Sequence, residues 1–425
     1  MISKIRIWFT QSIPLDLTQK VIETFSTRIL LILFSLVTSV IVARSLGPEG
    51  RGLYALALTI GMLGVQFTNL GLHSSNTFYV ARDPNLLSPL LGNSLLASFS
   101  MGGLGALLGG LLFYRFPELA PINGIILVLA LLWIPFGLAY LLNQNLLLGI
   151  QDTRSFNQLE VFNKGISIVL LLLVIFLDRV SPTAIFATSF IALIICLGWA
   201  LNVLKKHIYH PIHISKSLFI KNLPYGIKSY LGSFVGFLLL RVDLLMINQL
   251  LGKKEAGLYD IAINMSEMVY LFPLVVSTII FPKLAAIESI QEKWKLSKNV
   301  GLALLVCTAI IIAVTALLAF PLIEFLYGED FVPCVPAFLF LIFSKFIMSA
   351  NSIFSNFVSS IYVPWAAVPF SFAVLGLNIL LNLIWIEQFG IIGAAYASIA
   401  SFALFIPFYY YYTMKYLRDQ DAIPQ

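Results

Sequence analysis

The sequence predicts an all-α membrane protein with about 12 transmembrane helices, arranged as two parallel-repeat six-helix lobes. Three observations predict this fold class. Of the 425 residues, 59% are hydrophobic and 11% are charged, with a mean hydropathy of +0.94. Apolar runs of membrane-spanning length recur along the chain, and a short motif repeats at an offset of 205 residues. Soluble domains average about 45–50% apolar and about 25% charged residues, so this composition excludes a soluble enzyme.

The apolar runs define the predicted helices in chain order. Each contains close to the ~20 apolar residues that one crossing of the bilayer requires. The runs cover residues 21–43, 53–72, 90–113, 122–147, 161–177, 183–204, 226–250, 257–281, 300–322, 336–360, 365–386 and 391–412.

The connections between the runs are mostly short and contain Gly, Pro or charged residues, so neighbouring helices are expected to run antiparallel. The longest polar stretch, residues 205–224, is predicted to be a cytoplasmic linker. It would join an N-terminal six-helix lobe, residues 1–204, to a C-terminal six-helix lobe, residues 225–425.

The distribution of Lys and Arg predicts the orientation. If the N-terminus is cytoplasmic, the inner segments hold 17 of the 26 basic residues, beginning with Lys4, Arg6 and Lys20, and the outer loops hold 6, including Arg51. Both termini are therefore expected to be cytoplasmic. This pattern also explains the net charge of +6 without a nucleic-acid partner, and the three cysteines and four histidines form no pattern of a metal or cofactor site.

An internal repeat relates the two halves. The stretch 46–57 aligns without gaps on 251–262, and six of the twelve positions are identical. Each copy lies between the first and second helix of a six-helix set, so the halves have the same topology and are parallel repeats. Transporters are often built in this way, with the substrate path between the repeats. The alternative is a chance match of two apolar helix starts.

Polar side chains inside the apolar runs mark the expected cavity, because uncompensated polar groups are costly in lipid. In the tenth run they recur at spacings of 4, 3 and 4 and so share one helical face: Lys345, Ser349, Ser352 and Asn356. Shorter sets of this kind occur in the second run, Gln66 and Asn69, and in the eighth run, Asn264 and Glu267.

Three cations lie within the helices, namely Arg28, Arg241 and Lys345. Lys345 is near the middle of its run, with no acid in the same run, which favours a place in the cavity. Arg28 is about 10 Å from the start of its run, so it either faces the cavity or snorkels to the interface. Arg241 either faces the cavity or forms a structural pair with another helix, because Asp243, two residues on, points about 200° away on a helix.

Asn143 and Gln144 in the fourth run are the remaining candidates. Amides there either hydrogen-bond sugar hydroxyls or join helices to one another. No catalytic set of carboxylates, Ser/His/Asp or Cys/His stands out in the loops or at helix ends, so the chain is not expected to be an enzyme.

Four short stretches lie at the boundaries of the predicted helices. The first is 44–54, RSLGPEGRGLY, together with the stretch to Leu72. The others are 148–154, LGIQDTR; 326–331, LYGEDF; and 390–397, GIIGAAYA. In these stretches, in their order and in their places at helix boundaries, the chain resembles the bacterial polysaccharide biosynthesis flippases of the multidrug, oligosaccharidyl-lipid and polysaccharide exporter superfamily.

The resemblance implies two six-helix lobes around a V-shaped cavity. It also implies movement of undecaprenyl-pyrophosphate-linked oligosaccharide units from the inner to the outer leaflet of the bacterial cytoplasmic membrane by alternating access, for a surface polysaccharide such as O-antigen. The implied partners are this lipid-linked substrate, membrane lipids, a proton or sodium ion for coupling, and the polymerase and glycosyltransferases of the same polymer.

Two alternatives stay open from the sequence. One is an ion-coupled multidrug exporter of the same superfamily, which needs a buried carboxylate; Asp260 and Glu267 are the hints for it. The other is a membrane-embedded glycan polymerase, which the short outer loops disfavour.

Overall fold

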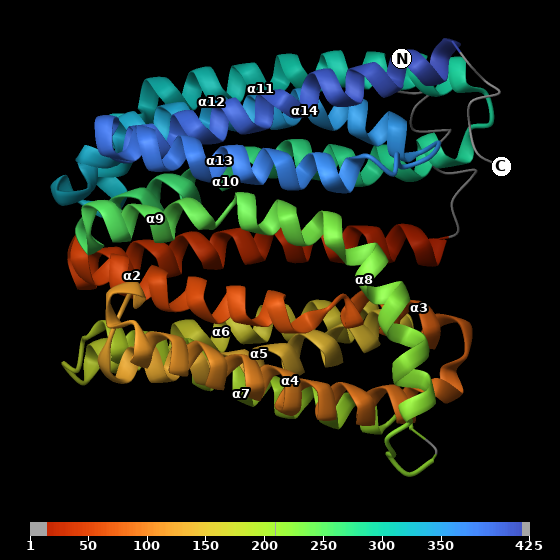
Figure 1. The fold of residues 1–425 in the computed structure, drawn as a ribbon, viewed down its shortest axis with the longest axis horizontal. Helices are drawn as coiled ribbons and strands as arrows, with labels where there is room; N and C mark the ends of the chain where they lie inside the picture. Colours follow the sequence, from red (N-terminus) through yellow and green to blue (C-terminus); the bar gives the residue numbers. More distant parts are fainter. Residues whose placement is uncertain (1–14, 209, 419–425) are drawn as a thin grey trace. The chain divides into compact units, whose positions relative to one another are not determined.

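The computed structural model describes residues 15–208 and 210–418, so Lys4 and Arg6 lie outside the described residues. The side chain of Lys20 is not described either. Within those ranges every regular element is a helix (Figure 1). The elements are α2 (Leu15–Asn69), α3 (Leu72–Arg82), η1 (Pro84–Leu86), α4 (Leu87–Arg115), η2 (Pro117–Leu119), α5 (Gly124–Gly149), α6 (Thr153–Phe176), α7 (Pro182–Lys205), α8 (Lys216–Leu239), α9 (Val242–Leu251), α10 (Lys253–Ala286), α11 (Ile290–Tyr327), η3 (Glu329–Cys334), α12 (Val335–Ser359), α13 (Ala367–Phe389) and α14 (Ile391–Arg418).

Eleven stretches of the described chain are long and apolar enough to cross a membrane. The first, Ser26–Asn69, has 44 residues. As one straight helix it would measure about 66 Å, roughly twice the hydrocarbon thickness. It is in fact two passes joined by a turn at Gly47. The stretches therefore account for all twelve predicted runs.

The turns at Gly47 and Gly252 support the predicted repeat. Gly47 has φ 65° and ψ −179°, and Gly252, its counterpart at the offset of 205, has φ 96° and ψ 178°. This region of backbone space is essentially restricted to glycine. The two copies thus share an unusual backbone conformation as well as their sequence.

The described residues group into two compact units. Unit 1 comprises residues within Met1–Ile41 and Ala57–Tyr230, and unit 2 comprises residues within Val42–Leu56 and Leu231–Gln425. The first turn of the repeat therefore belongs to unit 2, and residues 205–224 of the predicted linker belong to unit 1. The division of the helices into lobes of six and six stays a prediction.

Hydrogen bonds hold the predicted linker against α4 in unit 1. The Ser88 hydroxyl donates to the Pro211 carbonyl over 2.7 Å. The Asn93 amide makes two bonds of 2.9 Å with Ser215, donating to its carbonyl and accepting from its N–H. Because the backbone of this segment would otherwise lack partners, these side chains order it.

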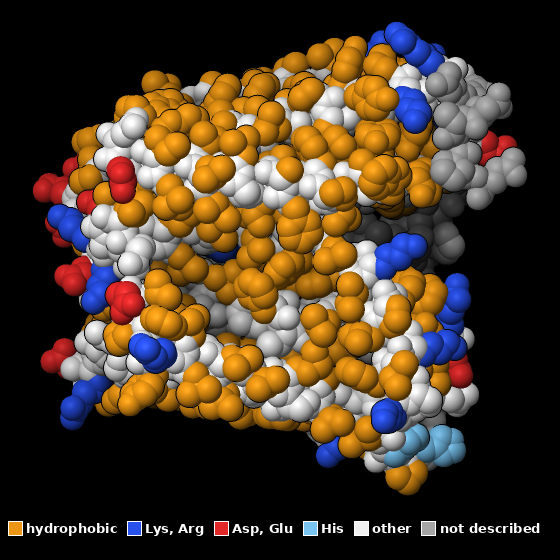
Figure 2. Space-filling view, viewed as in Figure 1, with side chains coloured by type: hydrophobic (Ala, Val, Ile, Leu, Met, Phe, Trp, Pro, Cys, Tyr) orange, Lys and Arg blue, Asp and Glu red, His pale blue; other side chains and the backbone are white. Residues whose placement is uncertain are grey.

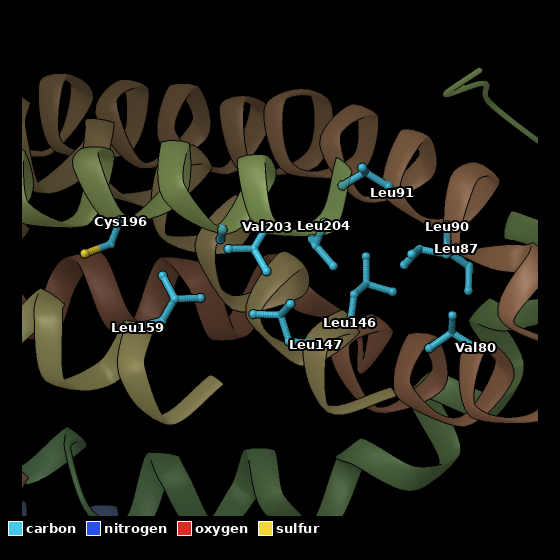
Figure 3. Packing of buried hydrophobic residues seen from close by; sticks show 11 residues of the cluster. Val80, Leu87, Leu90, Leu91, Leu146, Leu147, Leu159, Cys196, Val203 and Leu204 are labelled. Carbon is cyan, nitrogen blue, oxygen red and sulfur yellow. The ribbon is translucent and has the colours of Figure 1, made fainter. Parts of the chain in front are cut away.

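The core of unit 1 is a cluster of buried aliphatic side chains contributed by α3, α4, α5, α6 and α7 (Figure 3). Leu90, Leu146 and Leu204 are fully buried at its centre. Such packing supplies dispersion contacts that lipid cannot replace at the same density.

The outer faces of the helices are apolar and exposed. On α4, Leu104, Leu107, Leu108 and Leu111 are each more than half exposed and recur at helical spacing. Figure 2 shows the same character across the visible sides of both units, with Lys, Arg, Asp and Glu gathered towards the helix ends. An exposed apolar belt bounded by charge is the surface that a lipid bilayer covers.

Candidate functional site

The helix predicted for residues 226–250 is interrupted, which corrects the expectation of one continuous run. α8 ends at Leu239 and α9 begins at Val242. Arg241 lies at the break with φ −134° and ψ −21°, outside the helical region. Hydropathy along the run does not reveal the break, because apolar residues surround it on both sides. Discontinuous helices in transporters place helix ends and polar groups within the membrane.

Asp243 lies in the first turn of α9, the second part of this broken helix. Its side chain is 4% exposed, and its Oδ1 accepts a 2.9 Å hydrogen bond from the N–H of Leu244. Its Oδ2 accepts a 2.7 Å hydrogen bond from the hydroxyl of Tyr259, which is fully buried on α10. The carboxylate therefore receives hydrogen bonds from the backbone and from another helix, as a buried acid requires.

Arg241 pairs with Glu267 of α10 at 3.4 Å. The pair is partly exposed, with side-chain exposures of 20% and 37%. Arg241 and Asp243 thus have different partners, although Arg241 lies at the helix break, so the 200° spacing of a continuous helix does not apply to them. Arg241 therefore has an acid of another helix as its partner, and its place in the cavity stays a prediction. Asn264, also on α10, donates to the Asp260 carbonyl of its own helix at 2.7 Å.

Lys345 is 4% exposed and lines a small cavity together with Asp243, Ser344 and Ser398. The space open to the centre of a water molecule is about 10 Å³, which is enough for one water. Asp243 and Glu267 are close enough to attract the Lys345 ammonium. Lys345 has no acid within its own helix, as the sequence indicates, but the structure places acids of α9 and α10 near it. We call Arg241, Asp243, Glu267 and Lys345 the charge cluster.

The polar stripe on α12 lies on one face of the helix, as predicted. Its hydroxyl protons are donated to the same helix: Ser349 to the Lys345 carbonyl and Ser352 to the Ser349 carbonyl, both at 2.7 Å. Asn356 lines a different small cavity, between α10, α11 and α12. Lys345, Ser349 and Ser352 are all buried within unit 2, and their role in lining a substrate path stays a prediction.

Arg28 pairs with Glu160 of α6 at 2.9 Å in unit 1, and half of the Arg28 side chain is exposed. Gln144 is placed to donate a hydrogen bond to the same carboxylate. Asn143 is fully buried; its Nδ2 donates to the Ala139 carbonyl at 2.7 Å, and its Oδ1 has no partner among the described residues. With Arg28 paired, each of the three intramembrane cations has an acid nearby.

Gln66 and Asn69 belong to a polar network at the end of α2 in unit 1. The Tyr230 hydroxyl donates to the Gln66 carbonyl at 3.1 Å and also to its side-chain oxygen. The Asn69 amide lies 2.7 Å from His73 Nδ1, and Ser74 Oγ lies 3.0 Å from His73 Nε2. Burial lowers the pKa of the His73 imidazole, which favours the neutral ring. These contacts join neighbouring helical segments.

The structure also brings together a pair that sequence reasoning missed. Arg51, expected in an outer loop, is buried at a helix start and forms an ion pair with Asp260 at 2.6–2.8 Å, with side-chain exposures of 6% and 7%. The repeat contained a signal for it. At the offset of 205, Arg51 aligns with Ala256 and Asp260 aligns with Ala55. Each charged residue thus corresponds to an alanine in the other copy of the repeat.

Comparison with known proteins identifies the family. The family model described as polysaccharide biosynthesis protein matches residues 17–288, well over half of the chain. The chain belongs to the polysaccharide biosynthesis protein family. This confirms the family that the stretches 44–54 and 148–154 resemble; the stretches 326–331 and 390–397 lie beyond the matched residues.

Curated relatives of this family member are distant. A probable low-salt glycan biosynthesis flippase, Agl15, of Haloferax volcanii is 24% identical over 216 residues, which are 50% of this chain and 45% of that protein. An uncharacterized membrane protein of Methanocaldococcus jannaschii is 22% identical over 245 residues, 56% of this chain and 48% of that protein. The chain thus spans about half the length of the curated relatives that it matches.

Solved structures show the same fold. A lipid II flippase, MurJ, in an inward closed conformation superposes with a TM-score of 0.72 at 18% identity, covering 94% of this chain and 87% of that one. An inward-facing multidrug resistance MATE family transporter of the MOP superfamily superposes with a TM-score of 0.67 at 13% identity, covering 94% and 99%. The predicted fold class, an all-helical membrane transporter fold, is confirmed.

Proposed function

We propose that the protein is a flippase that moves lipid-linked oligosaccharide repeat units from the inner to the outer leaflet by alternating access. The observation that carries the proposal is the charge cluster beside the broken helix α8–α9, in a chain of the polysaccharide biosynthesis protein family. A sugar head group with a pyrophosphate cannot cross hydrocarbon without losing many hydrogen bonds to water. A path for it therefore needs polar groups, and cations for the pyrophosphate, at membrane depth.

The pairing of the cations suggests how the site alternates between an empty and a loaded state. Without substrate, Asp243 and Glu267 balance Lys345 and Arg241, so no unpaired charge is left in the membrane. A pyrophosphate would replace these acids as the partner of the two cations. The displaced carboxylates would then take up a proton or a sodium ion, which couples ion movement to substrate movement.

The finer assignments are part of the same proposal. The substrate is undecaprenyl-pyrophosphate-linked, and its polymer is a surface polysaccharide such as O-antigen. The protein resides in the cytoplasmic membrane of a bacterium with both termini cytoplasmic, and it works with a polymerase and glycosyltransferases. The positive charge of the inner segments, 17 basic residues against 6, supports the orientation. Both curated relatives come from archaea, so the bacterial location is an assignment that experiment has to test.

Both acids that hinted at an ion-coupled drug exporter have cationic partners. Asp260 pairs with Arg51, and Glu267 pairs with Arg241. A cavity for cationic drugs requires an acid that is available to the drug. These two acids therefore give the exporter alternative no support.

The decisive experiment is deletion of the gene followed by complementation. The proposal expects lipid-linked repeat units to accumulate in the inner leaflet of the deletion strain. Single unpolymerised units outside the cell would instead indicate a polymerase, and sensitivity to drugs alone would indicate an exporter.

Complementation with variants of Lys345 tests the charge cluster. Lys345→Arg should retain much of the transport, Lys345→Ala should lose most of it, and Lys345→Glu should lose all of it while the protein still inserts. Lys295→Glu is the matched control, because Lys295 is exposed on α11. Full transport by Lys345→Glu would remove Lys345 from the substrate site and leave it as a packing residue.

A further inference from the structure

A larger chamber of about 400 Å³ lies within unit 2, between α8, α10, α12, α13 and α14. This volume is in the range of small-molecule sites, which start at about 300 Å³. The chamber is distinct from the cavity of Lys345, but the two share Leu239, Leu240 and Phe402 as wall residues. The two spaces are therefore neighbours, separated by these three apolar side chains.

The lining of the chamber contains no Lys, Arg, His, Asp or Glu. One wall is aromatic: Phe402, Phe405 and Tyr409 are three and four residues apart on α14 and so share a face. The opposite part of the lining carries amide and hydroxyl groups. A chamber without charge selects a neutral ligand, since an ion there would lack a partner.

Several hydrogen-bonding groups of the lining have no partner within the described residues. Asn351 Oδ1 is buried and accepts no hydrogen bond. The hydroxyls of Tyr270 and Tyr409, both half-buried on the lining, make none within the described chain either. An amide turns easily about its terminal torsion, so the Asn351 oxygen can face the chamber. Unmet donors and acceptors in an otherwise apolar pocket are typical of a site for a hydrogen-bonding ligand.

Two glycines of α8 help to leave the chamber open. Gly232 and Gly236 are one helical turn apart, and a Cβ on either would have no atom within 4 Å. Larger residues there would project into the space. The missing side chains on α8 thus contribute to the volume of the chamber, and amide and hydroxyl groups form another part of its lining.

We propose that this chamber binds a neutral sugar residue of the lipid-linked oligosaccharide while its pyrophosphate is at the charge cluster. The inference rests on the proposed function. A sugar ring presents C–H faces to the aromatic side chains and hydroxyls to Asn351, Tyr270 and Tyr409, which meets both features of the lining. The polyprenyl chain is the competing occupant, but it would leave the three polar groups without partners, at a cost in free energy.

The test compares two lipids in binding to the purified full-length protein. One is the lipid-linked oligosaccharide extracted from the deletion strain, and the other is undecaprenyl pyrophosphate without sugar. The wild type should bind the first more tightly. Asn351→Leu should reduce that preference by about tenfold, the effect of one or two hydrogen bonds. Gly236→Leu should also reduce it, because the new side chain would fill space proposed for the sugar. Both variants should leave binding of the sugar-free lipid unchanged.

Controls separate the possible failures. Gly376→Leu, on an exposed face of α13 with open space around it, should bind both lipids as the wild type does. If Gly236→Leu does not fold, Tyr270→Phe replaces it. Weaker binding of both lipids by the chamber variants would place the polyprenyl chain there and overturn the proposal, as would an unchanged sugar preference. A wild type that binds neither lipid would instead contradict the proposed function itself.

Discussion

Two regions of unit 2 contain the same kinds of residue, but these residues have different roles in each region. The first is the repeat crossing, defined as residues 46–56 and 251–262, where the two copies of the repeat meet. The second is the chamber next to the charge cluster. Each contains glycines and buried polar side chains, but the surroundings of these residues differ.

At the repeat crossing the glycines allow contact and the polar groups are paired. A Cβ on Gly52 would overlap the carbonyl oxygen of Lys253, and one on Gly257 would overlap that of Pro48. Beside this contact Arg51 and Asp260 form their buried ion pair. In the chamber the glycines face open space, and Asn351 Oδ1 has no partner among the described residues.

The comparison teaches that residue type alone does not assign a role. A buried polar group with a partner stabilises the fold, whereas one without a partner costs stability until a ligand supplies the hydrogen bond. A glycine at a backbone contact is required by packing, whereas a glycine beside a chamber leaves room. Substitutions in the two regions should therefore affect different measurements.

The largest effect is expected at the glycines of the repeat crossing. Gly52→Leu or Gly257→Leu should abolish or strongly lower the yield of folded protein, because backbone atoms cannot move aside as a flexible side chain can. Yield is measured by size-exclusion chromatography in detergent, with Gly376→Leu as the control. Normal yield with abolished transport would break the comparison and make the crossing part of the substrate path.

The ion pair of the repeat crossing should give the next largest effect. Asp260→Asn leaves the Arg51 guanidinium buried without its charge partner and should lower the free energy of unfolding by about 3–5 kcal/mol. Denaturant titration in detergent measures the change. The double variant Arg51→Met, Asp260→Leu should recover much of the loss, because no unpaired charge remains. If Asp260→Asn lowers the free energy of unfolding by no more than the loss of an exposed ion pair does, the role assigned to this contact is contradicted.

The smallest effect is expected at Asn351, and it sharpens the comparison with a paired amide. Asn378 is 1% exposed; it donates to Ser401 and accepts from Asn382, each at 3.0 Å. Asn378→Leu should lower the free energy of unfolding by about 1–3 kcal/mol, because it leaves buried partners unsatisfied. Asn351→Leu should leave stability unchanged or raise it. Equal losses in the two variants would show that Asn351 has a structural role.

The membrane fold could be read from the sequence because its causes are local. Lipid requires each crossing to satisfy its own backbone, so a run of about 20 apolar residues is sufficient evidence for a helix. Helical periodicity likewise placed Lys345, Ser349 and Ser352 on one face. The repeat was evident too, because six of twelve positions of 46–57 and 251–262 are identical, whereas the backbone conformation of Gly47 and Gly252 came from the structure.

The partners of the polar residues were decided by the tertiary structure alone. Arg28 pairs with a residue 132 positions away, and Arg51 with one 209 positions away. Residues of five helices, α8, α10, α12, α13 and α14, line the chamber. Periodicity specifies the face of a helix on which a side chain lies but not the helix that packs against that face. Whether a buried charge or amide is satisfied depends on those neighbours, and the sequence determines them only through the packing of the whole chain.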